Sequence, residues 1–172
     1  MHEFAVDPPM EERVGDLLER RGETVAVAEG CTGGLVGALL TSRPGASAYL
    51  DRVVVPYDYD ALRDLLAVSR ETLDAHGAVS EPAARETAQA ARDTADATWG
   101  VGATGVLGPG GGTPETPVGT AFVAVAYAGE WESGTTETRV ERHALDGDRR
   151  ELKSEVARTT LRMLHEAIIA QG

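Results

Sequence analysis

The chain has little of several residue types, and each shortage excludes a class of protein. Cys31 is the only cysteine among 172 residues, which excludes an internal disulfide and any zinc or iron–sulfur site that needs several cysteines. No run of about eighteen apolar residues occurs, so we expect no membrane-spanning helix. Residues 1–7 lack the basic start and apolar run of a signal peptide, and we therefore expect a cytoplasmic location.

Positive charge is also scarce. The chain carries 28 acidic and 16 basic residues, and its net charge is −12. Such a surface repels phosphate backbones, so we expect no binding to nucleic acid. Lys153 is the only lysine, and all other basic residues are arginines. Abundant acid with almost no lysine indicates adaptation to concentrated salt, where self-repulsion is screened. An ordinary acidic cytoplasmic protein is the simpler alternative.

Salt adaptation predicts how the stability of the fold responds to ionic strength. We expect the midpoint of thermal unfolding to rise between about 0.1 M and about 2 M NaCl, because screening weakens repulsion among the acidic side chains. Circular dichroism across the salt series measures this midpoint. Sucrose is the control for solutes that stabilise proteins by exclusion from the surface. Full stability at low salt would contradict the expectation.

Helix and strand signals alternate along the chain. Helices are indicated by apolar spacing at 3.6 residues, by N-terminal caps and by terminating glycines, and strands by short apolar runs between polar residues. The predicted helices span residues 8–21 (begun by Asp7-Pro8-Pro9 and ended by Gly22), 35–43, 62–66, 80–97 and a last helix from Asp146 or Asp148. The predicted strands span 24–28, 53–57, 99–104, 118–127 and about 135–144, the last two forming a hairpin around 129–132.

This order predicts one layered α/β domain over residues 1–172, with a mixed sheet because of the late hairpin. The inner face of the last helix is expected to carry Leu152, Val156, Thr160, Met163, Leu164, Ala167 and Ile168. Ligands of such folds bind at the carboxyl ends of the strands. Three loops are expected there, at 29–34, 57–60 and 105–117.

The segment Gly100–Gly105 matches the pattern GxGxxG but does not predict a dinucleotide site. That motif needs a helix that opens at its third glycine, and here Gly-Pro-Gly-Gly-Gly follows at 108–112. Five glycines between Gly105 and Gly112 allow backbone N–H groups to converge on an anion or a carbonyl. Because prolines stiffen residues 113–117, a shaped binding loop is favoured over a flexible connection.

Residues 29–34 read Glu-Gly-Cys-Thr-Gly-Gly and predict a tight strand-to-helix turn. Such turns present backbone donors at a helix N-terminus, where anions are stabilised. Cys31 is either a low-pKa nucleophile or inert packing, and the absence of a histidine nearby in the sequence favours packing. The four histidines lack metal-ligand spacing, so no metal site is expected. His165 is expected at the surface, and His76-Gly77 at the end of a helix.

Taken together, these segments resemble the CinA C-terminal domain, or nicotinamide-nucleotide amidase, family. The matching stretches follow the family order over nearly the whole chain, at 24–34, 44–47, 54–57, 76–81, 104–114, 117–120 and 147–149. The resemblance implies a three-layer α/β/α sandwich with a mixed, mostly parallel sheet and a nucleotide pocket. It implies hydrolysis of the amide of nicotinamide mononucleotide to the acid and ammonia. It also implies a homo-oligomer, and no cofactor is expected.

The chain departs from the family at the two positions that carry the chemistry. The family turn reads Ala-Glu-Ser-Cys-Thr-Gly-Gly with the serine as nucleophile, and here that position is Gly30. The family segment Tyr-Ser-Asn-x-x-Lys supplies the base, and here the lysine position is Leu62. Glycine offers no nucleophile, leucine accepts no proton, and the adjacent Arg63 stays protonated. Lys153 is expected to be a surface charge. We therefore assign no catalytic residue and expect little or no amidohydrolase activity.

The positions that remain predict binding. By resemblance, the expected ligand-binding residues are Cys31, Thr32, Gly33, Gly34, Tyr57, Thr104, Gly105, Gly110, Gly111, Gly112, Thr113 and Arg149. Arg149 is the cation expected near a phosphate, with a surface charge as the alternative. Asp58, Tyr59 and Asp60 make the pocket mouth acidic, which disfavours a phosphorylated ligand. The partner expected is a small molecule, a nicotinamide or related nucleotide.

Three functions stay open. The first is a CinA-like protein that binds a nucleotide without hydrolysing it. The second is an active nicotinamide mononucleotide amidohydrolase that uses Cys31, Thr32 or a pocket water in place of the serine. The third is a scaffold without a ligand, in which the turn at 29–34 only closes the fold.

Overall fold

The computed structural model describes residues 8–172, so Asp7 at the expected helix start and the rest of the N-terminal segment lie outside the described residues. The helices in this part are α1 (Met10–Arg21), α2 (Leu35–Ser42), the 3-10 helix η1 (Ala46–Ala48), α3 (Tyr59–Leu66), α4 (Arg70–His76), α5 (Glu81–Ala95) and α6 (Arg149–Ala170). The strands are β1 (Val25–Glu29), β2 (Leu50–Val54), β3 (Trp99–Gly105), β4 (Thr120–Tyr127) and β5 (Glu137–Ala144). None of the described helices combines the length and apolar character needed to cross a membrane.

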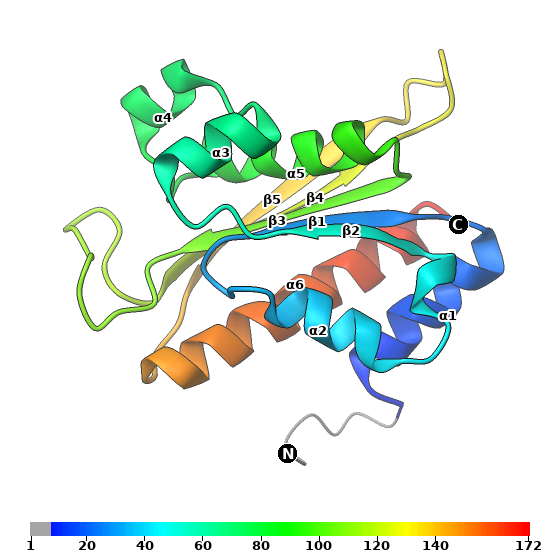
Figure 1. The fold of residues 1–172 in the computed structure, drawn as a ribbon, viewed down its shortest axis with the longest axis horizontal. Coiled ribbons are helices and arrows are strands. Elements are labelled where there is room, and N and C mark those ends of the chain that lie inside the picture. The colour runs from blue at the N-terminus through cyan, green and yellow to red at the C-terminus, as the bar shows by residue number, and fades with distance from the viewer. Residues whose placement is uncertain (1–7) are drawn as a thin grey trace.

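The five strands form one sheet in the order β2-β1-β3-β4-β5. β1 pairs in parallel with β2 and β3, whereas β4 is antiparallel to both β3 and β5. Only β4 therefore runs against the direction of the other strands. Helices α3, α4 and α5 lie on one side of the sheet, and α1, α2 and α6 lie on the other (Figure 1). The three-layer sandwich with a mixed sheet is confirmed.

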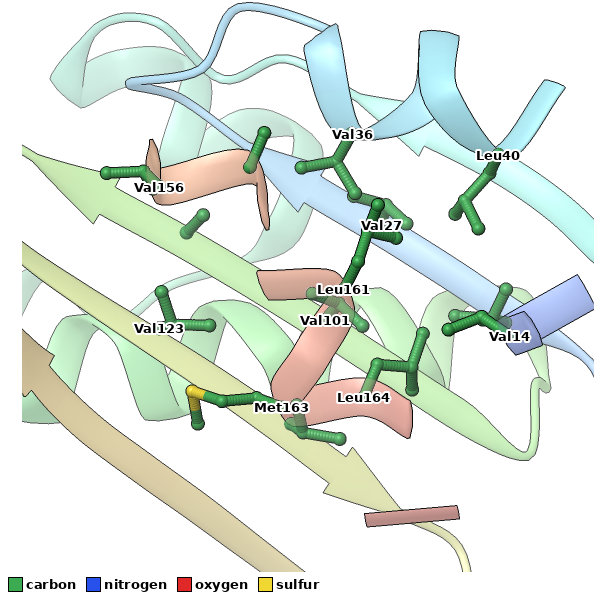
Figure 2. Packing of buried hydrophobic residues seen from close by; sticks show 14 of the residues in the cluster. Val14, Val27, Val36, Leu40, Val101, Val123, Val156, Leu161, Met163 and Leu164 are labelled. Atoms are coloured by element: carbon green, nitrogen blue, oxygen red, sulfur yellow. The ribbon is translucent and has the colours of Figure 1, made fainter. Parts of the chain in front are cut away.

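The larger core lies between the sheet and helices α1, α2 and α6. Figure 2 shows side chains from β1, β3 and β4 meeting those of α2 and α6, among them Val27, Val101, Val123, Val36, Leu40, Val156, Leu161 and Leu164. The expected inner face of α6 is buried, except that Ala167 is only half-buried. Burial of this apolar surface is the main force that joins the two layers.

On the other face of the sheet, α5 contacts β3 at backbone distance because two positions of β3 lack a Cβ atom. A Cβ built on Gly100 would lie 2.0 Å from the carbonyl oxygen of Ala88, and one on Gly102 would lie 2.9 Å from that of Ala84. The GxGxxG glycines all lie within β3, so no helix opens at the third one. At Gly100 and Gly102 they allow α5 to pack closely on the sheet.

Helix termini follow the local sequence signals. Gly22 ends α1 in the left-handed conformation, and the Ser80 side chain accepts a hydrogen bond from the amide of Ala83 at the start of α5. Of the two candidates for the start of α6, Asp148 is the cap, and it forms a capping box with Glu151. These caps satisfy backbone groups that a helix cannot pair internally.

Several expected bounds are wrong. The strand expected at 53–57 is β2, at Leu50–Val54, and Pro56 lies beyond it, where its missing N–H leaves no gap in the ladder. Helix α4 was not expected as an element, although its end at Gly77 was. The hairpin strands begin later than expected, at Thr120 and Glu137.

His165 is a further correction, because it is buried and not at the surface, with only 8% of its area exposed. Helix α6 contacts α1 as well as the sheet, so its buried arc is wider than one apolar stripe. Burial lowers the pKa of the His165 imidazole, and the nearby Arg13 guanidinium lowers it further.

The close packing of α5 on β3 predicts the effect of a single methyl group. We expect Gly100→Ala to lower the free energy of unfolding by about 2 kcal/mol or more, because the new Cβ would lie 2.0 Å from the Ala88 carbonyl oxygen and within 2.7 Å of the Arg92 Cβ and amide nitrogen. Gly110→Ala is the matched control, since a Cβ at Gly110 meets nothing within 4 Å. We expect that variant to stay within about 0.5 kcal/mol of the parent. Urea denaturation measures both, and equal stability of the two variants would contradict the packing argument.

Candidate functional site

A cavity of about 270 Å³ opens where β1 and β3 end. Its lining consists of Gly30, Cys31, Pro56, Tyr57, Asp58, Tyr59, Leu62, Ala78, Val79, Thr87, Ala103, Thr104, Gly105, Leu107 and Arg149. All three loops expected at this edge of the sheet contribute, while Thr87 of α5 and Arg149 of α6 come from opposite layers of the sandwich. The cavity therefore spans the edge of the sheet, as ligand sites of α/β folds do.

The turn at 30–34 is held by the carboxylate of Glu29, which is fully buried. Its Oε2 accepts hydrogen bonds from the Thr32 hydroxyl at 2.5 Å and the Val36 amide at 2.9 Å, and its Oε1 accepts one from the Gly37 amide at 2.8 Å. Two of these donors belong to the first turn of α2, whose positive end favours an anion. Glu29 thus caps α2 from the preceding strand and fixes the turn.

Thr32, Gly33 and Gly34 do not line the cavity. The Thr32 side chain is fully buried and its hydroxyl donates to Glu29. Gly33 and Gly34 adopt left-handed backbone with φ of 60° and 97°, which lets the chain turn from β1 into α2. These three residues, which were expected to contact a ligand, instead shape and stabilise the turn.

Gly30 lines the cavity at the start of the turn. Its amide donates to the carbonyl oxygen of Ala103 at 3.1 Å, which ties the turn to β3. Its backbone is not left-handed, and a Cβ there would have the Pro56 carbonyl oxygen at 3.1 Å as its nearest neighbour. A small side chain therefore fits at this position after a shift of a few tenths of an ångström.

Cys31 lines the cavity beside Gly30. Burial raises the pKa of its thiol to about 12, and the Glu29 carboxylate adds to the rise, while backbone amides and Arg149 oppose it. The thiol therefore stays protonated at neutral pH, and a protonated thiol is a poor nucleophile.

Arg149 reaches the cavity from the first turn of α6. Its Nη1 donates to the Gly108 carbonyl oxygen at 2.6 Å and its Nη2 donates to the Tyr57 hydroxyl at 2.9 Å. Within residues 8–172 the guanidinium forms no ion pair with a carboxylate. Arg149 is thus a positioned cation with donors to spare, not a partner of an acidic surface residue.

The glycine-rich loop contributes only its first residues to the lining of this site. Gly105 and Thr104 line the cavity, and the Thr104 hydroxyl donates to the Ala78 carbonyl oxygen at 2.9 Å. Gly110, Gly111, Gly112 and Thr113 are exposed and do not line it. The loop projects from the end of β3 (Figure 1), and Arg142 holds it through the Glu115 carbonyl oxygen at 2.9 Å.

The acidic mouth expected at 58–60 is partly neutralised by local contacts. Asp58 lines the cavity and caps α3 by accepting from the Ala61 amide at 2.8 Å. The Tyr59 hydroxyl donates to Asp74 at 2.5 Å. Asp60 does not line the cavity and lies 3.9 Å from Arg63.

The inner wall is apolar, and sequence reasoning missed most of it. Leu62 is buried and packs with Leu66 and Val68 in the cluster that also holds Ala26 and Ala28 of β1. Four further residues line the cavity but were not among the expected ligand-binding residues, namely Ala78, Val79, Thr87 and Leu107. Ala78, Val79 and Leu107 lie within stretches that resemble the family, and Thr87 is a polar residue on the alanine-rich inner face of α5.

Lys153 differs from the surface charge expected. It is half-buried, and its ammonium nitrogen lies 3.3 Å from the position of a Cβ built on Gly33. It does not line the cavity. The lysine therefore lies beside Gly33 of the turn and outside the cavity lining.

Comparisons with known proteins identify the family of this fold. The sequence profile described as the CinA C-terminal domain matches residues 7–168. The CinA-like protein of Anaeromyxobacter sp. (strain K) is 50% identical over 151 residues. This chain belongs to the CinA C-terminal domain family. The crystal structure of the competence/damage inducible protein CihA from Agrobacterium tumefaciens superposes with a TM-score of 0.85 at 36% identity, covering 98% of this chain and 99% of that one.

The CinA-like relatives are longer than this chain. The alignment with the Anaeromyxobacter protein covers 88% of this chain but 35% of that protein. For the CinA-like protein of Chlorobaculum tepidum, which is 44% identical over 155 residues, the shares are 90% and 36%. The chain thus spans about a third of the length of these relatives.

The raised pKa of Cys31 predicts its reactivity with iodoacetamide. We expect native protein at pH 8 to be alkylated roughly 100-fold more slowly than an ordinary thiol, because very little thiolate is present. The rate should climb with pH up to about pH 11 without a plateau, since the folded-state pKa lies at about 12. The urea-unfolded protein is the control, with a plateau above about pH 9. Mass spectrometry reads out the single cysteine, and rapid labelling of native protein at pH 7 would contradict the prediction.

Proposed function

We propose that this domain binds a nicotinamide-type nucleotide in the cavity and has little or no amidohydrolase activity. The observation that carries the proposal is the lining itself, in which Gly30 and Leu62 occupy the positions that resemble the family's nucleophile and base. Acyl transfer by a side chain needs both a nucleophile and a group that deprotonates it. The domain keeps a cavity of ligand size without either group.

No other pair in the lining supports hydrolysis. The Cys31 thiol is protonated, the Thr104 hydroxyl donates to a carbonyl, and the Tyr57 hydroxyl accepts from Arg149. The lining carboxylate, Asp58, is engaged as the cap of α3. Thr32, the other candidate nucleophile, faces Glu29 and not the cavity. These contacts favour binding over hydrolysis by an alternative nucleophile.

Binding is favoured over an empty scaffold by the state of Arg149. Although the chain carries 28 acidic residues, no carboxylate of residues 8–172 pairs with this guanidinium, and two hydrogen bonds to neutral oxygens hold it at the cavity. Charge-assisted hydrogen bonds to a phosphate would use its remaining donors. An anionic group at this end of the ligand is therefore part of the proposal.

The proposal predicts binding without turnover. With nicotinamide mononucleotide we expect heat of binding in titration calorimetry and no ammonia above the uncatalysed rate. Arg149→Gln should weaken binding at least about tenfold, because a charge-assisted contact is lost. Arg150→Gln is the matched control, since the exposed neighbour on α6 does not line the cavity. Ammonia release that disappears in Cys31→Ala would contradict the proposal, and so would absence of binding.

A restored variant is the positive control for the cavity in the same assay. Gly30→Ser with Leu62→Lys supplies the missing hydroxyl and amine, and the space at residue 30 admits the new side chain. Gly30→Ala with Leu62→Lys matches it in bulk and charge but lacks the hydroxyl. Ammonia release by the first variant and not by the second would attribute the lost activity to these two positions.

A further inference from the structure

We infer that Thr87 contacts the ligand at the α5 wall of the cavity and selects an uncharged hydrogen-bonding group there, such as a carboxamide. This inference rests on the proposed function and names which end of the ligand lies where. It assigns a role to a residue outside every motif that resembles the family.

The hydrogen-bonding state of Thr87 distinguishes it from the other polar side chains of the lining. The oxygen and nitrogen groups of the others have partners within the protein, in Tyr57, Asp58, Tyr59, Thr104 and Arg149. Thr87 is only 4% exposed, and its hydroxyl forms no hydrogen bond with any residue in the range 8–172. The hydroxyl is not one of the fully buried polar atoms without a partner in the described residues, so it remains accessible from the cavity that the residue lines.

The helix itself offers Thr87 a partner that it does not use. Three other helical threonines donate to the carbonyl four residues earlier, namely Thr41 to Gly37, Thr94 to Ala90 and Thr160 to Val156. The Thr87 hydroxyl is not turned back in this way. Because the residue lines the cavity and is otherwise covered, the cavity is the space from which a partner can reach it.

The surroundings of Thr87 exclude a charged partner. Its neighbours on the inner face of α5 are alanines, which pack with Leu62 on one side and with Val79 on the other. The charged residues of the lining are Asp58, at the start of α3, and Arg149, at the start of α6. An ionised group beside Thr87 would be buried among apolar side chains without an opposite charge. A neutral carbonyl or amide would instead pair with the hydroxyl, which can both donate and accept.

The two ends of the cavity therefore differ in the groups they accept. Arg149 comes from the layer of α6 and takes the anionic group, and Thr87 comes from the layer of α5 and takes the neutral one. A nucleotide that carries a carboxamide fits both ends. The corresponding acid places a carboxylate against the apolar wall, so the domain should discriminate between the two forms.

Calorimetry with nicotinamide mononucleotide and nicotinic acid mononucleotide tests this assignment. We expect the wild-type protein to bind the amide form at least about tenfold more tightly than the acid. Thr87→Val should weaken binding of the amide form about tenfold, and Thr87→Ser, which keeps the hydroxyl, should bind nearly as the parent does.

Thermal unfolding without ligand provides a second readout, with Thr160→Val as the matched control. Thr160 is also a buried helical threonine, but its hydroxyl donates to the Val156 carbonyl oxygen at 2.7 Å. Losing that bond should lower the unfolding midpoint by about 2–4 °C and leave ligand binding unchanged. Thr87→Val should not lower the midpoint, because it removes a hydroxyl that forms no hydrogen bond within residues 8–172.

Each contrary result overturns a different statement. Equal binding of the amide form by the wild type and Thr87→Val overturns the contact with Thr87, as does a fall in midpoint as large as that of Thr160→Val. Equal affinity of the wild type for amide and acid overturns the selectivity, and it needs no variant. If the wild type binds neither nucleotide, the proposed function fails together with this inference.

Discussion

The buried carboxylate of Glu29 is the constraint on which this end of the molecule depends. A carboxylate without exposure to water needs partners, and Glu29 finds them in the Thr32 hydroxyl and in two amides at the start of α2. These bonds set the turn between β1 and α2 without any contribution from the side chain at residue 30. The conformation of the turn therefore does not depend on a nucleophilic side chain at Gly30. The hydrogen bonds that shape the turn are independent of any group that would carry out a reaction there.

The same separation holds at Leu62, for a different reason. A lysine in this apolar wall would have to be desolvated, which costs free energy and lowers its pKa. Leucine instead packs with Leu66 and Val68 against the alanines of β1, and burial of its side chain stabilises the fold. Under the proposed function, leucine in place of lysine removes the desolvated amine that hydrolysis needs and adds apolar contacts to the core. Trade-offs between activity and stability lead one to expect such a change.

Local signals predicted most of the fold, and contacts between distant elements account for the rest. The helix ends at Gly22, Ser80 and Asp148 could be predicted because a cap involves only neighbours in the chain, although the sequence left Asp146 as an alternative to Asp148. The bounds of β2 were wrong because this edge strand carries Asp51 and Arg52, so its apolar pattern is incomplete. Helix α6 also packs against α1, and Arg13 of α1 lies near the buried His165, which no periodicity within α6 reveals.

The candidate site divides in the same way. Tyr57, Thr104 and Arg149 come together at the cavity, as their motifs indicated. The direction of the Thr32 side chain could not be predicted from the sequence, because it depends on the orientation of the buried Glu29 carboxylate, which accepts its hydrogen bond.

Thr87 illustrates a different limit of sequence reasoning. Its place depends on how closely α5 approaches the sheet, and Gly100 and Gly102 decide that distance from another element. The absence of a Cβ at two positions of β3 thus brings a hydroxyl of α5 to the same cavity as a guanidinium of α6. Under the proposed function, Thr87 and Arg149 bind the ligand from opposite layers of the sandwich, and neither contact depends on the side chain present at Gly30 or Leu62.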